Sequence, residues 1–205
     1  MTTGGARVEW LCVGGSAGPW ERLGLVVVVD GLAPLFGTGI RFAEHAESGI
    51  DGWALSGVER QVTDVDGLPT EVVEPAPPVL VSHPLGAYEL DHVVVTTGSL
   101  ERTCAAITDV TGAPLQRVRE LGAMRQGFHR LCGLVVEVVA RAELGDEPAS
   151  FWGLVLNVDD LDAAVARLGP DVVGPAKPAV QPGRSIATVR EAAGLGLPVA
   201  LMSPP

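Results

Sequence analysis

The sequence predicts an α+β fold made of repeated βαβββ units. A β-branched strand followed by an amphipathic helix occurs twice in the second half of the chain. The apolar residues of the two helices have the same internal spacing, and each copy continues into an arginine-containing strand and a closing apolar strand. The two copies lie about 60 residues apart, which is the signature of an internal repeat.

The first copy starts at the β-branched run LDHVVVTT, residues 90–97, which predicts a strand. Ser99 can cap the helix that follows, and Gly112 is expected to end it. The apolar face of this helix is formed by Leu100, Cys104 and Ile107. Strands at 124–131 and 134–140 complete a unit that we place at 88–141.

The second copy has the same order. A strand at 153–158 precedes an aspartate cap at Asp159 or Asp160, and Gly169 stops the helix. The helix face of Leu161, Val165 and Leu168 repeats the spacing of the first copy. Strands at 185–190 and 197–202 close this unit, which we place at 150–205, so that both units together form one domain at 88–205.

Residues 1–82 are expected to form a degenerate βαβββ-like region. The apolar run from Leu23 to Val29 is interpreted as a buried strand, and the segment EPAPPVLVSHPLG, 74–86, as a linker because its four prolines break periodicity. The other expected elements are strands at 8–13, 32–36, 39–43, 53–58 and 71–74 and a helical turn at 19–23.

Composition narrows the class of protein. Hydrophobic residues make up 47% of the 205 residues and charged residues 19%, which predicts a folded chain. A net charge of −11 argues against nucleic-acid partners and against an acidic membrane surface. The first residues lack a basic segment followed by an apolar core, and the three cysteines form no CxxC pair. We therefore expect a cytoplasmic protein with reduced thiols.

Two strands carry ionisable residues among valines. Alternation places His92 and Glu137 on one face of their strands, where a buried carboxylate needs a donor, a metal or water. If a three-residue turn at 132–134 joins the last two strands of the first copy, His129 lies opposite Glu137. These three residues then form a self-satisfied His–Glu pair, a facial triad for a metal, or part of a binding pocket.

Arginines and one tryptophan are candidates for ligand contacts. Arg125 and Arg184 lie on or beside strands predicted to line the cups, and a guanidinium can hold a carboxylate through two hydrogen bonds. Pairing with acidic residues on the outer face is the alternative. Trp152, just before the second repeat strand, is expected either to cap a ligand or to fill the core.

The quoted segments LDHVVVTTGSLERTCAAITDVTG and LVVEVVA, with FWGLVLNVDDLDAAVARLG and IATVREAAGLGLPVALMSP, resemble the two modules of vicinal-oxygen-chelate, or glyoxalase-like, proteins. The resemblance covers residues 90–204. It implies incomplete barrels of the glyoxalase/dihydroxybiphenyl dioxygenase type, with a cleft in each cup. Activities in the family include lyase and isomerase reactions, extradiol ring cleavage, epimerisation and drug sequestration.

The resemblance also implies where a metal would bind. It places family metal ligands at His92 and Glu137, whereas the matching positions of the second copy hold Gly153 and Ala200, which cannot ligate. The cofactor is therefore expected to be either none or a divalent ion such as Fe, Mn, Ni or Zn. Such an ion would need a further ligand from His129 or from the first half, where the candidates are Glu44, His45 and Glu71.

The leading hypothesis is a glyoxalase-like protein that binds a small polar or anionic organic molecule without a complete metal site. Arg125, His129, Arg184 and Trp152 are the expected ligand contacts. Two alternatives stay open: a divalent-metal-dependent lyase, isomerase or dioxygenase, and a structural or partner-binding protein whose cups are filled. Whether the protein is an enzyme is left undecided. The resemblance implies a homodimer as a further option, because this architecture often completes its cups by pairing chains.

Overall fold

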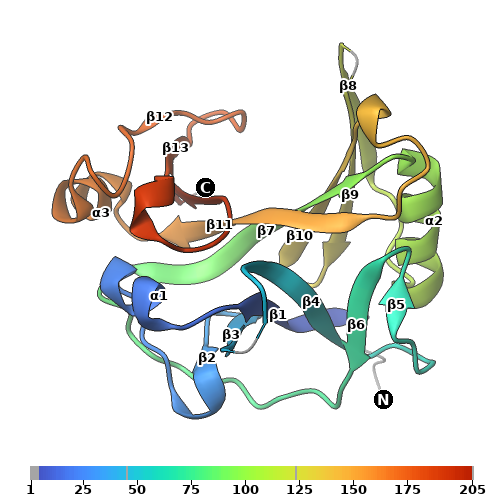
Figure 1. Ribbon diagram of the computed structural model, residues 1–205, viewed down its shortest axis with the longest axis horizontal. Helices are drawn as coiled ribbons and strands as arrows, with labels where there is room; N and C mark the ends of the chain where they lie inside the picture. Colours follow the sequence, from blue (N-terminus) through green and yellow to red (C-terminus); the bar gives the residue numbers. More distant parts are fainter. Residues whose placement is uncertain (1–4, 45, 123, 205) are drawn as a thin grey trace.

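The chain folds into two mixed β-sheets that pack against each other, with short helices at their margins (Figure 1). The computed structural model describes residues 5–44, 46–122 and 124–204. The N-terminal sheet has the strand order β2-β3-β1-β4-β6-β5, and the C-terminal sheet has the order β12-β13-β14-β11-β7-β10-β9-β8.

The C-terminal sheet consists of two βαβββ units joined through their first strands. The first unit contains β7 (Ala87–Thr97), α2 (Leu100–Thr111), β8 (Arg117–Leu121), β9 (Met124–Leu131) and β10 (Leu134–Ala140). The second contains β11 (Ser150–Val158), α3 (Leu161–Leu168), β12 (Lys177–Pro178), β13 (Ser185–Thr188) and β14 (Val199–Met202). Strands β7 and β11 are antiparallel, and each pairs in parallel with the last strand of its own unit. The predicted repeat is confirmed, and the curled sheet does not close into a barrel.

Local signals that were readable in the sequence set the two main helices. The Ser99 hydroxyl accepts a hydrogen bond from the Arg102 N–H at 3.4 Å, and Asp160 accepts one from the Ala163 N–H at 2.9 Å. Gly112 ends α2 in the left-handed conformation, with φ of 69°. The apolar faces of both helices then cover the outer side of the C-terminal sheet.

The N-terminal sheet repeats the same plan on a smaller scale. Its elements are β1 (Arg7–Gly14), α1 (Gly18–Leu23), β2 (Leu32–Ala33), β3 (Gly39–Ala43), β4 (Gly49–Ser56), β5 (Asp64–Val65) and β6 (Leu68–Val72). Strands β1 and β4 are antiparallel, β3 is parallel to β1, and β6 is parallel to β4. This pairing matches the C-terminal sheet, with a shortened helix in one unit and no helix between β4 and β5.

The run from Leu23 to Val29 does not form the expected strand. Leu23 ends α1, and Gly24 follows with φ of 109°. Val29 begins a 3₁₀ turn, Val29–Gly31, in which Asp30 has φ of 65°. Two left-handed residues so close together leave too little extended chain for a ladder. The Val26 N–H instead donates to Nδ1 of His83, and Val29 is 84% exposed. Here local backbone turns override β propensity.

The core lies between the two sheets. Trp53 of β4 is buried, its ring meets Phe151 of β11 edge-on at 5.4 Å, and its indole N–H donates to the Thr70 hydroxyl at 2.8 Å. The contact with Phe151 joins the two sheets, whereas the hydrogen bond to Thr70 holds Trp53 within the N-terminal sheet. The concave side of the C-terminal sheet is left open. In the described part of the chain, no helix has the length and apolar content that crossing a bilayer requires.

Candidate functional site

A cavity of about 740 Å³ occupies the concave face of the C-terminal sheet, and we call it the cup. Strands β7 and β10 form its floor, the β8–β9 hairpin forms one wall, and residues 177–182 with β13 form the other. The two hairpins stand apart above the central strands in Figure 1. A volume of this size is within the range of small-molecule sites. The cup is not filled with apolar side chains, contrary to the third functional alternative.

His92 lies at the floor of the cup between two carboxylates. Its Nδ1 is 2.7 Å from Oδ2 of Asp91, and its Nε2 is 3.7 Å from Oε2 of Glu137. Because Nδ1 donates to Asp91, Nε2 is the ring nitrogen that faces Glu137 and the cup. The arrangement fixes both the tautomer and the orientation of the imidazole.

Asp91 is in turn held by Arg184, which precedes β13. The Arg184 Nη1 donates to Oδ1 of Asp91 at 2.7 Å, and Nη2 donates to Oδ1 of Asn157 at 2.5 Å. Both Nε and Nη2 also donate to the Ser203 carbonyl. Burial on its own raises the pKa of Asp91, but hydrogen bonds from His92 and Arg184 outweigh it and hold that pKa well below its usual range. Asp91 therefore stays ionised.

The pKa of Glu137 is shifted upward, opposite to the shift of Asp91. Burial raises the pKa of Glu137, and the nearby charges of His92 and Arg119 only partly offset this. The Gln126 amide donates to Oε1 of Glu137 at 2.7 Å. The floor thus combines a carboxylate that resists protonation with a second one that accepts a proton more readily than an exposed glutamate.

Cationic side chains surround this floor. The lining includes Arg117, Arg119, Arg130 and Lys177, against the two carboxylates of Asp91 and Glu137. The Arg117 guanidinium lies 5.6 Å from the centre of the Phe128 ring. Sequence reasoning missed Arg117 and Arg119 because β8 is a short edge strand without a clear hydrophobic period. Arg130, Gln126 and Phe128 alternate along β9, which was a usable signal once the register was known.

The register of β9 and β10 corrects the predicted pairing of His129 with Glu137. The turn has two residues, Cys132 and Gly133, so Leu131 pairs with Leu134 and Glu137 lies opposite Phe128. Cys132 adopts φ of 54°, as a tight hairpin turn of this length requires. The predicted turn was one residue too long. In the observed register, His129 therefore lies on the face of the sheet opposite to Glu137.

His129 packs on the helix side of β9. It is 1% exposed, its Nδ1 lies 3.1 Å from the Ala113 carbonyl at the end of α2, and its Nε2 is buried without a hydrogen-bond partner. Burial lowers the pKa of His129 despite the hydrogen bonds that its ring donates to the backbone carbonyls of Ala113 and Pro114. His129 borders the cup, but its neutral ring is turned toward the end of α2, and the proposed site does not include it.

The remaining expected ligand contacts also lie elsewhere. Arg125 is on the helix side of β9 and pairs with Glu101 of α2 at 2.7 Å, so the expected placement in the cup was wrong. Arg184 is below the floor, with its guanidinium donors used by protein groups. Trp152 is a bulge residue of β11 and is 47% exposed, so it neither lines the cup nor fills the core.

The residues at the floor do not supply a complete metal site. Pairing of β11 with β7 and β14 places Gly153 and Ala200 where the second unit would repeat His92 and Glu137. A Cβ on Gly153 would lie 2.5 Å from the Pro198 carbonyl oxygen, so no larger side chain fits there. Within residues 5–44, 46–122 and 124–204, no three His, Cys, Asp or Glu side chains are grouped to hold an ion. Glu71 lies in β6 and Glu44 directly follows β3, so both are in the N-terminal half, and His45 lies outside the described residues.

Solved structures share this architecture. The chain superimposes on a mutant of 4-hydroxymandelate synthase from Streptomyces coelicolor with a TM-score of 0.64 and 14% identity, over 97% of this chain and 92% of that chain. The protein has the vicinal-oxygen-chelate fold. No protein-family model and no curated protein matches the sequence significantly.

Smaller proteins with the vicinal-oxygen-chelate fold match part of the chain. Methylmalonyl-CoA epimerase from Mycobacterium tuberculosis gives a TM-score of 0.48 and 19% identity, over 58% of this chain and 90% of that chain. A methylmalonyl-CoA epimerase in complex with methylmalonyl-CoA and NH4+ gives a TM-score of 0.47 and 12% identity, over 57% of this chain and 94% of that chain. At these identities the likeness concerns the fold.

Proposed function

We propose that the protein binds a small organic anion in the cup of its C-terminal half. The observation that carries this proposal is the charge of the lining: four cationic residues line the cup together with two carboxylates, one of which is already neutralised by Arg184. In a chain with a net charge of −11, cations gathered at one cavity attract anions locally. The guanidinium groups of the β8–β9 wall, with Lys177 on the opposite wall, can hold a carboxylate or phosphate through charge-assisted hydrogen bonds.

The ligand also has an apolar part. Phe128 and Val135 line the cup on the first unit, and Ile186 and Met202 line it on the second. An apolar body placed between these side chains would remove surface from water at roughly 25 cal/mol per Å². A molecule with one aromatic or aliphatic end and one or two carboxylates satisfies both parts of the lining.

The floor adds a polar contact of defined direction. Nε2 of His92 accepts a hydrogen bond when Nδ1 donates to Asp91, and Glu137 donates one when it is protonated. These two groups lie side by side beneath the ligand, so they would recognise a hydroxyl next to a carbonyl or carboxyl oxygen. Asp91 and Arg184 serve as positioning residues, because they act on the ligand only through His92.

Binding of phenylsuccinate, an apolar dicarboxylate, tests the proposal by isothermal titration calorimetry. Substitution of Arg119→Gln should weaken its affinity by about tenfold or more, because a lost charge-assisted hydrogen bond costs roughly 1.5–3 kcal/mol. The matched control is Arg125→Gln, which makes the same change on the same sheet but on the helix side. The neutral diamide of phenylsuccinate should bind far more weakly than the acid.

Absence of phenylsuccinate binding, or equal losses in the Arg119→Gln and Arg125→Gln variants, would rule out an anion site in the cup. Trp152→Ala should leave the affinity unchanged, since Trp152 is outside the lining. If phenylsuccinate bound only in the presence of an added divalent metal, the metal-dependent alternative would be favoured instead. Size-exclusion chromatography of the same samples tests the expected homodimer, and the expectation of no nucleic-acid or membrane partner stays a prediction.

A further inference from the structure

A second cavity, of about 520 Å³, lies on the N-terminal half and is separate from the cup; we call it the N-terminal hollow. Residues of β1, β2 and β3 line one side, and the proline-rich linker at 76–80 lines the other. None of its lining residues is shared with the cup. Its volume is within the range of small-molecule sites.

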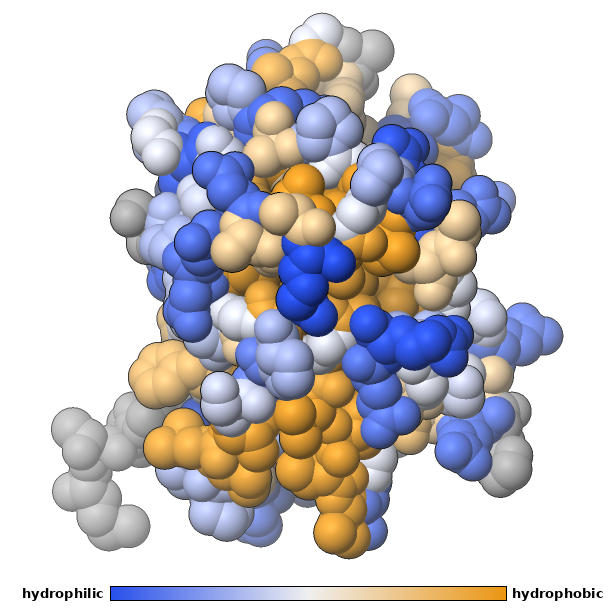
Figure 2. All heavy atoms as spheres, turned by 90° about the vertical axis from the view of Figure 1, so that its left-hand side faces the viewer, coloured by the Kyte–Doolittle hydropathy of each residue, from blue (hydrophilic) through white to orange (hydrophobic). Residues whose placement is uncertain are grey.

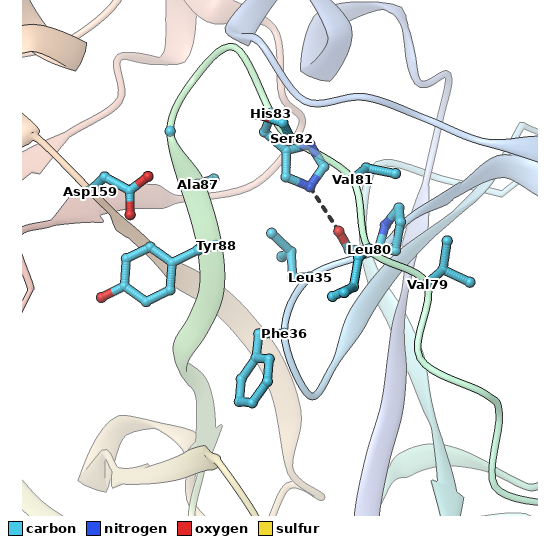
Figure 3. Close-up of a pocket in the computed structure, with 12 residues that line it drawn as sticks. Leu35, Phe36, Val79, Leu80, Val81, Ser82, His83, Ala87, Tyr88 and Asp159 are labelled. Atoms are coloured by element: carbon cyan, nitrogen blue, oxygen red, sulfur yellow. Dashed lines mark hydrogen bonds between the residues drawn. The ribbon is translucent and has the colours of Figure 1, made fainter.

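The linker is held firmly enough to serve as a wall. His83 is buried, its Nδ1 accepts from the Val26 N–H at 2.9 Å, and its Nε2 donates to the Pro34 carbonyl at 2.7 Å. Figure 3 shows this hydrogen bond and, beside it, Leu35, Phe36, Val79 and Leu80, which also line the hollow. The Ala76 N–H adds a contact at the start of the wall, 3.3 Å from Glu9.

The rim of the hollow exposes large apolar side chains. Leu80 is 83% exposed, Phe36 is 70% exposed and Val79 is 44% exposed. Figure 2 shows the left-hand side of the molecule, where apolar side chains gather on the lower part, at the height of the N-terminal half in Figure 1. Contiguous exposed apolar surface around a concavity is typical of binding sites.

One cation in the hollow lacks a partner. The guanidinium of Arg41 stacks on the Trp10 ring at 3.8 Å, and its Nε is buried with no hydrogen-bond acceptor. No carboxylate of the described residues lies within ion-pair distance of Arg41. Nε is closed off from the hollow, so a ligand would contact Arg41 through its two Nη groups, which are not buried.

The carboxylates nearest to the hollow are already occupied. Glu9 accepts from the Ser56 hydroxyl at 2.5 Å and lies 3.7 Å from Arg7, and Glu89 accepts from the Asn157 amide at 3.2 Å. Arg7 also donates to the Gly37 carbonyl. Arg41 is therefore the charged group in the hollow that is left for a ligand.

We infer that the N-terminal hollow is a second ligand site, which binds an apolar monocarboxylate. The carboxylate would accept hydrogen bonds from the fork of Arg41, and the apolar body would lie between Phe36 and Leu80 against the linker. This site is independent of the anion site proposed for the cup. With Arg7 beside Glu9, Arg41 is the one lining cation left for a ligand, and the nearby Glu9 and Glu89 carboxylates disfavour a second negative charge.

The probe is 2-naphthoate, titrated into the ¹⁵N-labelled full chain while amide chemical shifts are recorded. We expect shifts at Gly37, Gly39 and Leu80, which line the hollow, and an affinity that falls about tenfold in Arg41→Gln. Leu80→Asp is a second variant. Because Leu80 is exposed, the substitution should not affect folding, and the new carboxylate should weaken the binding of 2-naphthoate. Arg22→Gln is the control, because Arg22 is an exposed arginine of the same half outside the lining.

Three results would overturn the inference. They are no binding of 2-naphthoate, shifts confined to cup residues such as Gln116 and Gln126, or affinities in Arg41→Gln and Leu80→Asp that equal the affinity of Arg22→Gln. Tighter binding of phenylsuccinate than of 2-naphthoate at the shifted N-terminal amides would also contradict it. Since phenylsuccinate is the probe for the cup, failure of one site is distinguishable from failure of the other.

Discussion

Arg184 and Asp91 form a buried ion pair that joins the two units of the C-terminal sheet. Their contact is 2.7 Å long, with side-chain exposures of 9% and 12%. The second oxygen of Asp91 accepts from His92, so a residue of the second unit fixes the orientation of an imidazole in the first. The relationship connects the packing of the two units to the chemistry at the floor of the cup.

Replacing Arg184 with methionine should destabilise the protein strongly. The substitution keeps the volume but leaves Asp91 as an uncompensated buried charge, which costs roughly 3–5 kcal/mol in the free energy of unfolding. Urea denaturation measures the loss. Adding Asp91→Asn to Arg184→Met should recover part of it, because the unpaired charge is then gone. A loss of only about 1 kcal/mol, as for an exposed pair, would contradict the buried role.

Glu137→Gln should raise the thermal midpoint at pH 8. In the folded state the pKa of Glu137 is raised by burial, so its ionisation costs more there than in the unfolded chain. This destabilisation is fully present above the raised pKa and disappears as the pH falls below the ordinary glutamate value of about 4.3. The gain from Glu137→Gln should therefore shrink at acid pH. Calorimetry at several pH values checks this, and a gain that does not depend on pH would be inconsistent with it.

Much of the C-terminal fold was readable from local signals. The strands at 124–131 and 134–140 were predicted with the observed ends, and Ser99, Gly112 and Asp160 act as the expected caps. Each of these signals depends only on residues that are close together in the sequence, so tertiary contacts do not override it. The weaker N-terminal half was predicted less well, because two-residue strands carry no period and a positive φ at Asp30 is not visible in the residue type.

The candidate site was less predictable because it depends on register. One residue in the turn at Cys132 and Gly133 decides which face of β9 lines the cup, and sequence reasoning chose a longer turn. That error exchanged Arg125 for Arg130 as a cup residue. His92 and Glu137 were placed correctly beside each other because their position follows from the alternation of β7 and β10 alone.

His129→Asn should flatten the pH dependence of stability below neutral pH. The pKa of His129 is lowered in the folded state by burial, so the unfolded chain binds a proton first as the pH falls. Wild-type stability should therefore decrease below the ordinary histidine value of about 6.5. Asparagine keeps a donor for the Ala113 carbonyl and has no proton to gain. Unfolding free energies at pH 7.5 and pH 5.5 compare the two proteins, and equal slopes would refute the assignment of a neutral ring.

Ala200→Glu should create a metal site that the natural residues do not complete. Residue 200 pairs with Val155 as Glu137 pairs with Val94, and it shares the concave side of β14 with Met202. A glutamate there would add a third donor to Nε2 of His92 and the Glu137 carboxylate, a set suited to Co²⁺ or Ni²⁺. A metal ligand cannot be introduced at Gly153 in the same way, because the Pro198 carbonyl leaves no space for a side chain.

Affinity for Co²⁺, measured by calorimetry and by the visible absorption of the bound ion, should rise at least about tenfold over wild type in Ala200→Glu. Ala200→Gln is the matched control of similar size without the charge. The gain should be lost when Glu137→Gln is combined with Ala200→Glu, since the ion then has one carboxylate fewer. Equal Co²⁺ affinities for wild type, Ala200→Glu and Ala200→Gln would show that residue 200 does not face His92, and the pseudo-symmetric placement of the two units around the cup would have to be revised.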